Sequence, residues 1–216
     1  MARRSDRPTE RRYYTTDFEV RDRGAELRIA GHAAVFDQLS QNLGGFVERI
    51  APGAFRKTLR EADVRALFNH DPSLILGRTT AGTLRLSEDR AGLVYEVVLP
   101  DTQTGRDLRV SIERGDITQS SFGFRAIADR WDRDEDGTPL RTLTEVSLHN
   151  GDVSPVTFPA YLGTDVVARA VHQLARTTGV PADELAAALR HGRLPTDPPA
   201  PLLAAARARL DLLERL

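Results

Sequence analysis

The sequence predicts a β-rich α+β domain, built on a strongly bent sheet or a barrel with a few helices packed against it. Several segments alternate apolar and polar residues, as half-buried strands do, and turns rich in glycine, aspartate and proline separate them. Only short stretches between these segments have helical spacing. Together these observations favour a sheet-based core over a helical bundle.

The expected strands are the alternating segments, at residues 17–22, 25–36, 82–89, 92–100, 120–132 and 140–149. The turns "EDRAG" and "DRDEDGTP" join neighbouring strands as hairpins, because glycine supplies backbone angles that other residues avoid. One helix is expected at 52–62, opened by Pro52, and another at 104–116, ending at Gly115.

Three regions differ in composition. Residues 1–16 are rich in arginine and lack periodicity, which predicts a mobile arm. Residues 17–165 contain the expected sheet. Residues 166–216 are rich in Ala, Leu and Arg and predict a helical C-terminal tail, in which the proline-rich stretch 193–201 is a stiff linker.

Composition excludes several classes of protein. The 216 residues are 40% hydrophobic and 28% charged with a formal net charge of -1, a profile typical of soluble globular proteins. This near-neutral charge argues against nucleic-acid binding, and no apolar run predicts a membrane span or a signal peptide, so we expect a cytoplasmic location. Without cysteine, covalent catalysis must use an oxygen nucleophile or Lys57, the only lysine.

One acidic stretch imitates a calcium-binding loop. Asp132, Asp134, Asp136 and Gly137 match the start of such a loop, but the twelfth position, where calcium loops place glutamate, is Leu143. We therefore interpret the stretch as a hairpin turn. The five histidines are scattered along the chain, and we expect no metal and no cofactor.

A nucleophile, a base and an acid can be assembled from three parts of the chain. His70 interrupts the apolar run "ALFNHDPSLILGR", where a strand leaves the core and a side chain can face a cleft. Ser120 and Ser121 lie in "QSSFGF", and Glu145 and Asp152 are carboxylates further along. Serine, histidine and a carboxylate form the triad of serine hydrolases, which recurs on unrelated folds.

Alternation along the strand distinguishes the two serines. Phe122 and Phe124 share one face and should anchor the strand in the core, whereas Ser121 and Gly123 lie on the other face. Ser121 is therefore the expected nucleophile and Ser120 a structural residue. Gly123 is expected to leave room for the backbone of a substrate.

Successive blocks of the chain resemble the prohead proteases of tailed phages, which are capsid-maturation serine proteases similar to herpesvirus assemblin. The blocks are "GHAAVFD", "ERIAPGAF", "ALFNHDP", "GTLRLSEDRAGLVYEVVLPDT", "GDITQSSFGFRA" and "DVSPVTFPAY", and they cover residues 17–165 in order. The resemblance implies an assemblin-like bent sheet or barrel flanked by helices. It also implies that His70 and Ser121 are catalytic.

The third catalytic residue has more than one candidate. Asp152 occupies the acidic position of the family's "DVSPVTFPA" block and is favoured. Pairing outward from the 132–139 turn also places residue 150 opposite Ser121, which brings His149 and Asp152 near the serine and leaves Glu145 further away. His149 would reproduce the His-Ser-His arrangement of assemblin. Arg141 and Arg125 are candidates for stabilising the oxyanion.

The resemblance implies a serine endopeptidase that processes scaffold or major capsid protein, and itself, during prohead maturation. Such an enzyme would be made in the host cytoplasm and packaged inside the prohead, with a homodimer as one possible state. The alternative is a non-catalytic capsid-associated or scaffold protein with a degenerate protease domain. Cleavage of the capsid protein on co-expression distinguishes the two.

Overall fold

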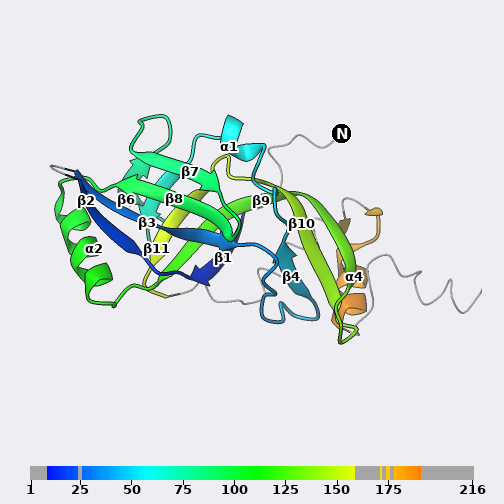
Figure 1. Ribbon diagram of the computed structural model, residues 1–216. Coiled ribbons are helices and arrows are strands. Elements are labelled where there is room, and N and C mark those ends of the chain that lie inside the picture. Colours follow the sequence, from blue (N-terminus) through cyan, green and yellow to red (C-terminus); the bar gives the residue numbers. More distant parts are fainter. Residues whose placement is uncertain (1–8, 24–25, 159–170, 172–173, 176–177, 191–216) are drawn as a thin grey trace, which may run out of the picture.

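The computed structural model describes residues 9–23, 26–158, 171, 174–175 and 178–190, and these residues form two sheets with three helices around them (Figure 1). The strands are β1 (Glu10–Thr15), β2 (Glu19–Arg23), β3 (Glu26–Val35), β4 (Val47–Ile50), β5 (Arg65–Phe68), β6 (Asp71–Arg78), β7 (Leu84–Glu88), β8 (Gly92–Val98), β9 (Gln119–Arg133), β10 (Pro139–Ser147) and β11 (Asp152–Val156). The helices are α1 (Thr58–Glu61), α2 (Gln103–Glu113) and α4 (Ala182–Arg190).

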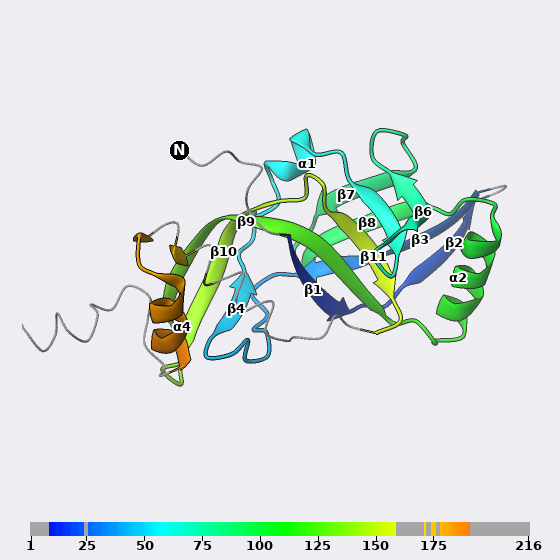
Figure 2. The same ribbon diagram turned by 180° about the vertical axis from the view of Figure 1, so that it is seen from behind.

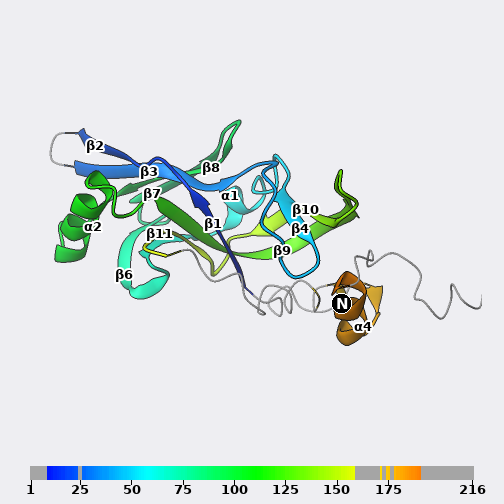
Figure 3. The same cartoon turned by 90° about the horizontal axis from the view of Figure 1, so that it is seen from below.

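The larger sheet is mixed and has the order β4-β10-β9-β11-β5-β6, with β1 paired to the remaining edge of β9. The smaller sheet has the antiparallel order β2-β3-β8-β7. Viewed from below, β3 and β8 lie in one layer and β9 and β11 in another (Figure 3). The long strand β9 belongs to both halves of the larger sheet, because β1 and β11 flank its first half and β10 pairs with its second half.

The core lies between the two sheets and is built around aromatic rings. Phe122 and Phe124 stack with ring centroids 4.8 Å apart, and Phe55 meets Phe122 edge-on at 5.7 Å. Tyr95 and Val97 of β8 are fully buried on the facing sheet. The alternating Phe-Gly-Phe pattern therefore anchors β9 as the sequence predicts, and it leaves the opposite face of the strand free for other side chains.

The two ends of the molecule carry helices. Figure 2 shows α2 beside the β2–β3 end and α4 beside the β9–β10 hairpin. Leu185 and Leu189 of α4 form a second apolar cluster with Leu43 and Phe46, and Trp131 packs against this cluster. No helix in the described part of the chain is long and apolar enough to cross a membrane.

A cluster of buried charges connects β1 to the body of the sheet. Arg141 is fully buried, and its guanidinium lies 2.8 Å from Asp129, 2.9 Å from Glu48 and 3.1 Å from Glu10. Arg12 of β1 pairs with both carboxylate oxygens of Glu48, at 2.7 and 3.0 Å. Burial alone would raise the pKa of Glu10, but attraction by Arg141 and Arg12 outweighs burial and lowers it. Glu10 therefore stays ionised beside the two arginines in the folded protein.

The β-rich α+β class predicted from the sequence is confirmed, as a bent mixed sheet rather than a closed barrel. The expected arm does not extend to residue 16, because residues 10–15 form β1 and pair with β9. The buried ion pairs of Glu10 and Arg12 explain how so polar a segment becomes a strand. The helix expected at 52–62 is shorter and covers only Thr58–Glu61. Residues 191–216 of the expected tail lie outside the described residues.

Candidate active site

The first half of β9 presents Ser121 between two neighbouring strands. In the register, Ser121 lies opposite Tyr13 of β1 on one side and opposite Ser154 of β11 on the other. Phe122 points into the core, so Ser121 points to the other face of the sheet. Ser121 thus lies on a stretch of β9 that is paired with another strand at each edge.

His70 is delivered by the tight turn between β5 and β6. Phe68 pairs with Asp71, so Asn69 and His70 alone form the loop, and their φ angles are +54° and +57°. Two-residue loops with positive φ at both positions favour Asn-Gly, because a side chain at the second position is crowded in the left-handed region. Asn69 fits this preference, and His70 departs from it.

Three hydrogen bonds fix this turn to the end of β11. The Asn69 amide N–H donates to the carbonyl of Pro155 at 3.0 Å, and its side-chain amide donates to the Thr157 hydroxyl at 3.1 Å. In return, the Thr157 amide N–H donates to Asn69 Oδ1 at 2.8 Å. These contacts hold the strained turn in place and aim His70 at the neighbouring strands.

Ser121, His70 and Asp152 lie in one line of contacts. The Ser121 hydroxyl oxygen is 2.7 Å from His70 Nε2, and His70 Nδ1 is 2.6 Å from Asp152 Oδ2. The imidazole can therefore accept the serine proton at one nitrogen while the carboxylate fixes the proton on the other. The side chains of His70 and Asp152 are 7% and 12% exposed, so bulk water screens these contacts little.

Asp152 reaches the histidine because β11 pairs with β9 next to Ser121. Val153 lies opposite Phe122, which places Asp152 beside Gly123, one step further along. A Cβ on Gly123 would lie 2.8 Å from Asp152 Oδ1. The expectation that Gly123 leaves room for substrate was wrong, because the Asp152 carboxylate occupies that space.

A fourth side chain, Ser154, joins this line and was missed by the sequence analysis. Its hydroxyl donates to Asp152 Oδ2 at 2.5 Å, the same oxygen that contacts His70, and the residue is fully buried. The available signal was spacing, because residues 152 and 154 lie on one face of a strand. The hydrogen bond fixes the orientation of the Asp152 carboxylate.

Ser121 itself has no exposed surface in this conformation. Besides His70, its hydroxyl contacts the main-chain carbonyl of Arg12 on β1, to which it can donate at 2.9 Å. A serine hydroxyl has one proton and cannot donate it to His70 and to the carbonyl at the same time. The Ser121 hydroxyl is thus in contact with the His70 imidazole and also with the main chain of β1.

The sequence matches a known protein family. The model of the caudovirus prohead serine protease family matches residues 16–177. The chain belongs to this family.

One solved structure that resembles this fold is the bacteriophage T4 capsid assembly protease, gp21. The similarity has a TM-score of 0.46 and 10% sequence identity, and covers 68% of this chain and 96% of that chain. No curated protein matches the sequence.

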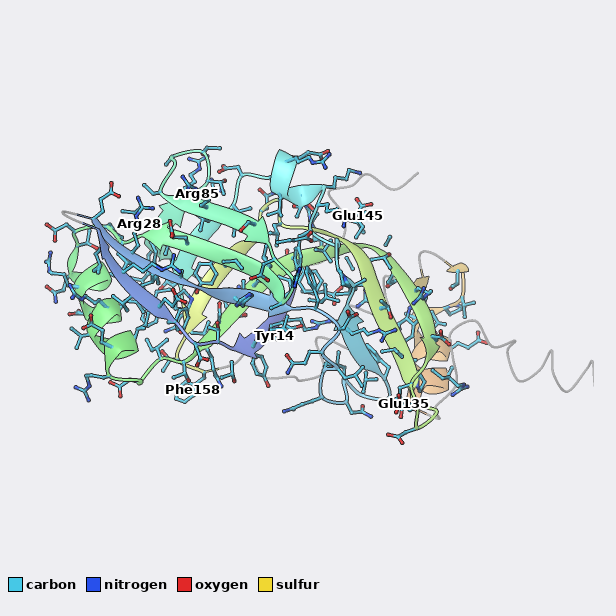
Figure 4. All side chains as sticks on the ribbon, viewed as in Figure 1. Tyr14, Arg28, Arg85, Glu135, Glu145 and Phe158 are labelled. Atoms are coloured by element: carbon cyan, nitrogen blue, oxygen red, sulfur yellow. The ribbon has the colours of Figure 1, made fainter. Side chains whose placement is uncertain are left out.

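The two other candidates for the third site residue lie away from the serine. Glu145 on β10 pairs with Lys57 at 3.2 Å, beside α1 (Figure 4). His149 lines the same pocket as Lys57 and Glu145, and none of Ser121, His70 and Asp152 is among the residues that line this pocket. The structure therefore brings Asp152, and neither Glu145 nor His149, into contact with His70.

The remaining residues singled out in the sequence have structural contacts. Arg141 is enclosed by three carboxylates in the buried charge cluster, and Arg125 donates to the carbonyl of His149 at 2.8 Å. Ser120 is fully buried on the core side, and its hydroxyl donates to Tyr95 at 3.2 Å. The acidic 132–139 stretch is the β9–β10 turn. Among the described residues, no cluster of His, Asp and Glu could hold a metal ion.

Proposed function

We propose that this protein is a serine endopeptidase that cleaves scaffold or major capsid protein, and itself, during assembly of a phage prohead. The observation that carries the proposal is the line of contacts from Ser121 through His70 to Asp152. Family membership supports it independently, because the matched family is that of prohead serine proteases. The close contacts argue against a degenerate protease domain, which would have no reason to keep all three groups in register.

The chemistry follows from the positions of these atoms. His70 Nε2 takes the proton of Ser121 as the serine oxygen attacks the scissile carbonyl, and then returns it to the leaving amine. Asp152 keeps the other imidazole proton on Nδ1 and stabilises the imidazolium that forms. Water then hydrolyses the acyl-enzyme. His70 takes a proton from this water as it attacks, and returns it to the Ser121 oxygen as that oxygen leaves. Ser154 holds the carboxylate in place throughout.

Co-expression with the capsid protein from the same genome tests the proposal. Intact-mass spectrometry of the capsid protein should give a shortened species with the wild-type chain and the full-length species with Ser121→Ala. Ser120→Ala is the matched control, since Ser120 is equally buried on the adjacent position but lies on the other face of β9. This control should retain cleavage.

Two results contradict the proposal. A capsid protein that stays full-length beside the wild-type chain, in assemblies that contain both proteins, would favour the non-catalytic alternative. Cleavage that survives Ser121→Ala but is lost in Ser120→Ala would show that the wrong serine has been assigned. Masses of the protease itself in the same samples report whether it also cleaves its own chain.

A further inference from the structure

A pocket separate from Ser121, His70 and Asp152 opens beside α1. It has a volume of about 390 Å³ and lies between α1 and the part of β9 that pairs with β10 (Figure 1). Its lining comes from these three elements and from the loop between β10 and β11. Pockets of this volume commonly bind ligands. The proposed hydrolysis gives this one no role.

The pocket lies on the same face of β9 as Ser121. Phe124 and Ala126 are buried in the core. The alternate residues Arg125 and Ile127 line the pocket, so they lie on the face that carries Ser121. Arg125 follows Ser121 by four positions, which corresponds to ~13 Å along a strand that rises ~3.3 Å per residue. An extended polypeptide bound at Ser121 can therefore reach the pocket with a residue about four positions from the scissile bond.

The loop between β10 and β11 connects the pocket to the candidate active site. Asn150 in this loop lines the pocket, and β11 begins two positions later at Asp152. A Cβ on Gly151 would lie 1.9 Å from the carbonyl oxygen of Gly123, so the loop packs directly onto β9. The wall of the pocket therefore continues into the carboxylate of the proposed triad.

The charged side chains of the pocket leave one carboxylate without an ion pair in the described part of the chain. Lys57 and Glu145 pair with each other at 3.2 Å. Arg125 is turned toward the loop, where it donates to the carbonyl of His149 at 2.8 Å. Glu61 lines the pocket from the end of α1, is exposed, and makes no ion pair with a described residue. The pocket therefore suits a ligand with a positive charge.

We propose that this pocket is a substrate subsite, which binds an arginine side chain of the polypeptide about four residues from the scissile bond. This inference rests on the proposed peptidase function. The guanidinium pairs with Glu61, and the aliphatic stem lies on Ile127 and Val146. Arginine suits the pocket better than lysine, because its guanidinium is more weakly hydrated and can make two hydrogen bonds to one carboxylate. An acidic side chain would instead meet the like charge of Glu61.

Peptides built on the cleavage site of the capsid protein test the inference. Mass spectrometry of the cleaved capsid protein locates the scissile bond, and each peptide then carries arginine in place of alanine at one flanking position. For the wild type, arginine about four residues from the scissile bond should raise kcat/KM about threefold to tenfold. The gain should come from a lower KM with kcat unchanged, because a remote contact is equally strong in the ground state and the transition state. In Glu61→Gln this gain should disappear.

Two further variants separate recognition from damage to the fold. Glu135→Gln is the matched control, because Glu135 is an exposed carboxylate in the β9–β10 turn, and it should keep the preference for arginine. Glu61→Arg should reverse the preference, so that glutamate is favoured over arginine at the same peptide position. A reversed preference cannot result from partial unfolding, which would slow the cleavage of all peptides together.

The failures of the two proposals differ. A wild type that cleaves the peptides without a preference for arginine, or with a preference that survives in Glu61→Gln, would overturn the subsite and leave the peptidase function intact. A preference for glutamate in the wild type would also overturn it. A capsid protein that stays full-length beside the folded wild type in assemblies would overturn the peptidase function, and the subsite with it.

Discussion

The two hairpin turns of the larger sheet obey different rules. In the β9–β10 turn, Gly137 adopts the positive φ of +79°, and the Asp134 side chain accepts from the amides of Asp136 and Thr138. In the β5–β6 turn, the second left-handed position holds His70. The first turn uses the residues that its geometry favours, whereas the second accepts strain to place an imidazole.

Under the proposed function, the β5–β6 turn is a place where a catalytic role overrides the local residue preference. A histidine in the left-handed region costs on the order of 1 kcal/mol relative to glycine, and the hydrogen bonds of Asn69 to the end of β11 help to offset it. No similar support is needed at the β9–β10 turn. Departures from local rules are expected at functional sites, and His70 is such a departure.

The largest expected effect concerns the partner that the β5–β6 turn reaches. Asp152→Asn should lower kcat/KM for peptide cleavage by roughly 10⁴-fold, because the amide no longer holds the imidazole in the required tautomer. Glu145→Gln and His149→Ala are matched controls on the β10 side and should stay within about threefold of wild type. A loss in either control as severe as that in Asp152→Asn would contradict the assignment of the carboxylate.

The next effect concerns the support of that carboxylate. Ser154→Ala should lower kcat/KM about 10-fold to 100-fold, because a hydrogen bond to a charged group contributes roughly 1.5–3 kcal/mol. Ser120→Ala is the matched control. Ser120 is equally buried but lies on the opposite face of β9 from Ser121, where it contacts Tyr95, so kcat/KM should be nearly unchanged. Equal losses in both variants would mean that Ser154 acts through packing and not through Asp152.

The strain at the turn can be isolated by comparing two inactive variants. His70→Ala and His70→Gly both remove the imidazole, but only glycine is relaxed at φ near +57°. The free energy of unfolding of His70→Gly should therefore be about 1 kcal/mol larger than that of His70→Ala. Gly137→Ala, in the β9–β10 turn, should lower the free energy of unfolding by about 1 kcal/mol relative to the wild type and leave peptide cleavage intact. Urea denaturation measures all three variants, and equal stability of the two His70 variants would show that the turn stores no strain.

The smallest expected effect is a dependence of stability on pH that comes from β1. The pKa of Glu10 is lowered in the folded state, so the unfolded chain takes up the proton at a higher pH than the folded chain does. Its contribution is fully present above the ordinary glutamate pKa of about 4.3 and is lost as the pH falls through the lower folded value. Glu10→Gln should be less stable than the wild type at pH 7, and its stability profile should be flatter below about pH 4.3 in thermal melts.

Much of the site could be predicted because it depends on local periodicity. Alternation along β9 places Ser121 on the opposite face from Phe122, as the structure shows. Counting outward from the β9–β10 turn predicts residue 150 opposite Ser121, but Ser154 lies there, because the residues between β10 and β11 shift the register. The resemblance to prohead proteases then favours Asp152 over Glu145. Each of these steps uses residues close together in the sequence or a motif of known order.

The rest depends on contacts between distant segments. β1 contains charged residues that become buried only because Glu48 and Arg141 meet them from other strands, and no local pattern reveals those pairings. The role of Ser154 could not be predicted either. Its hydroxyl bonds to the same Asp152 oxygen that contacts His70, and His70 reaches that oxygen from a distant turn. The left-handed turn at Asn69 and His70 is signalled only weakly, by asparagine in the first loop position.

The central claim is that Ser121 and His70 act in one catalytic step, and a double-mutant comparison tests it most directly. Rates of cleavage of the capsid protein should be measured for Ser121→Ala, His70→Ala and the double variant under identical conditions. Because members of such a unit depend on one another, each single variant should lose roughly 10⁶-fold and the double variant should be no slower than either. Losses that add, so that the double variant is far slower than both single variants, would contradict the account.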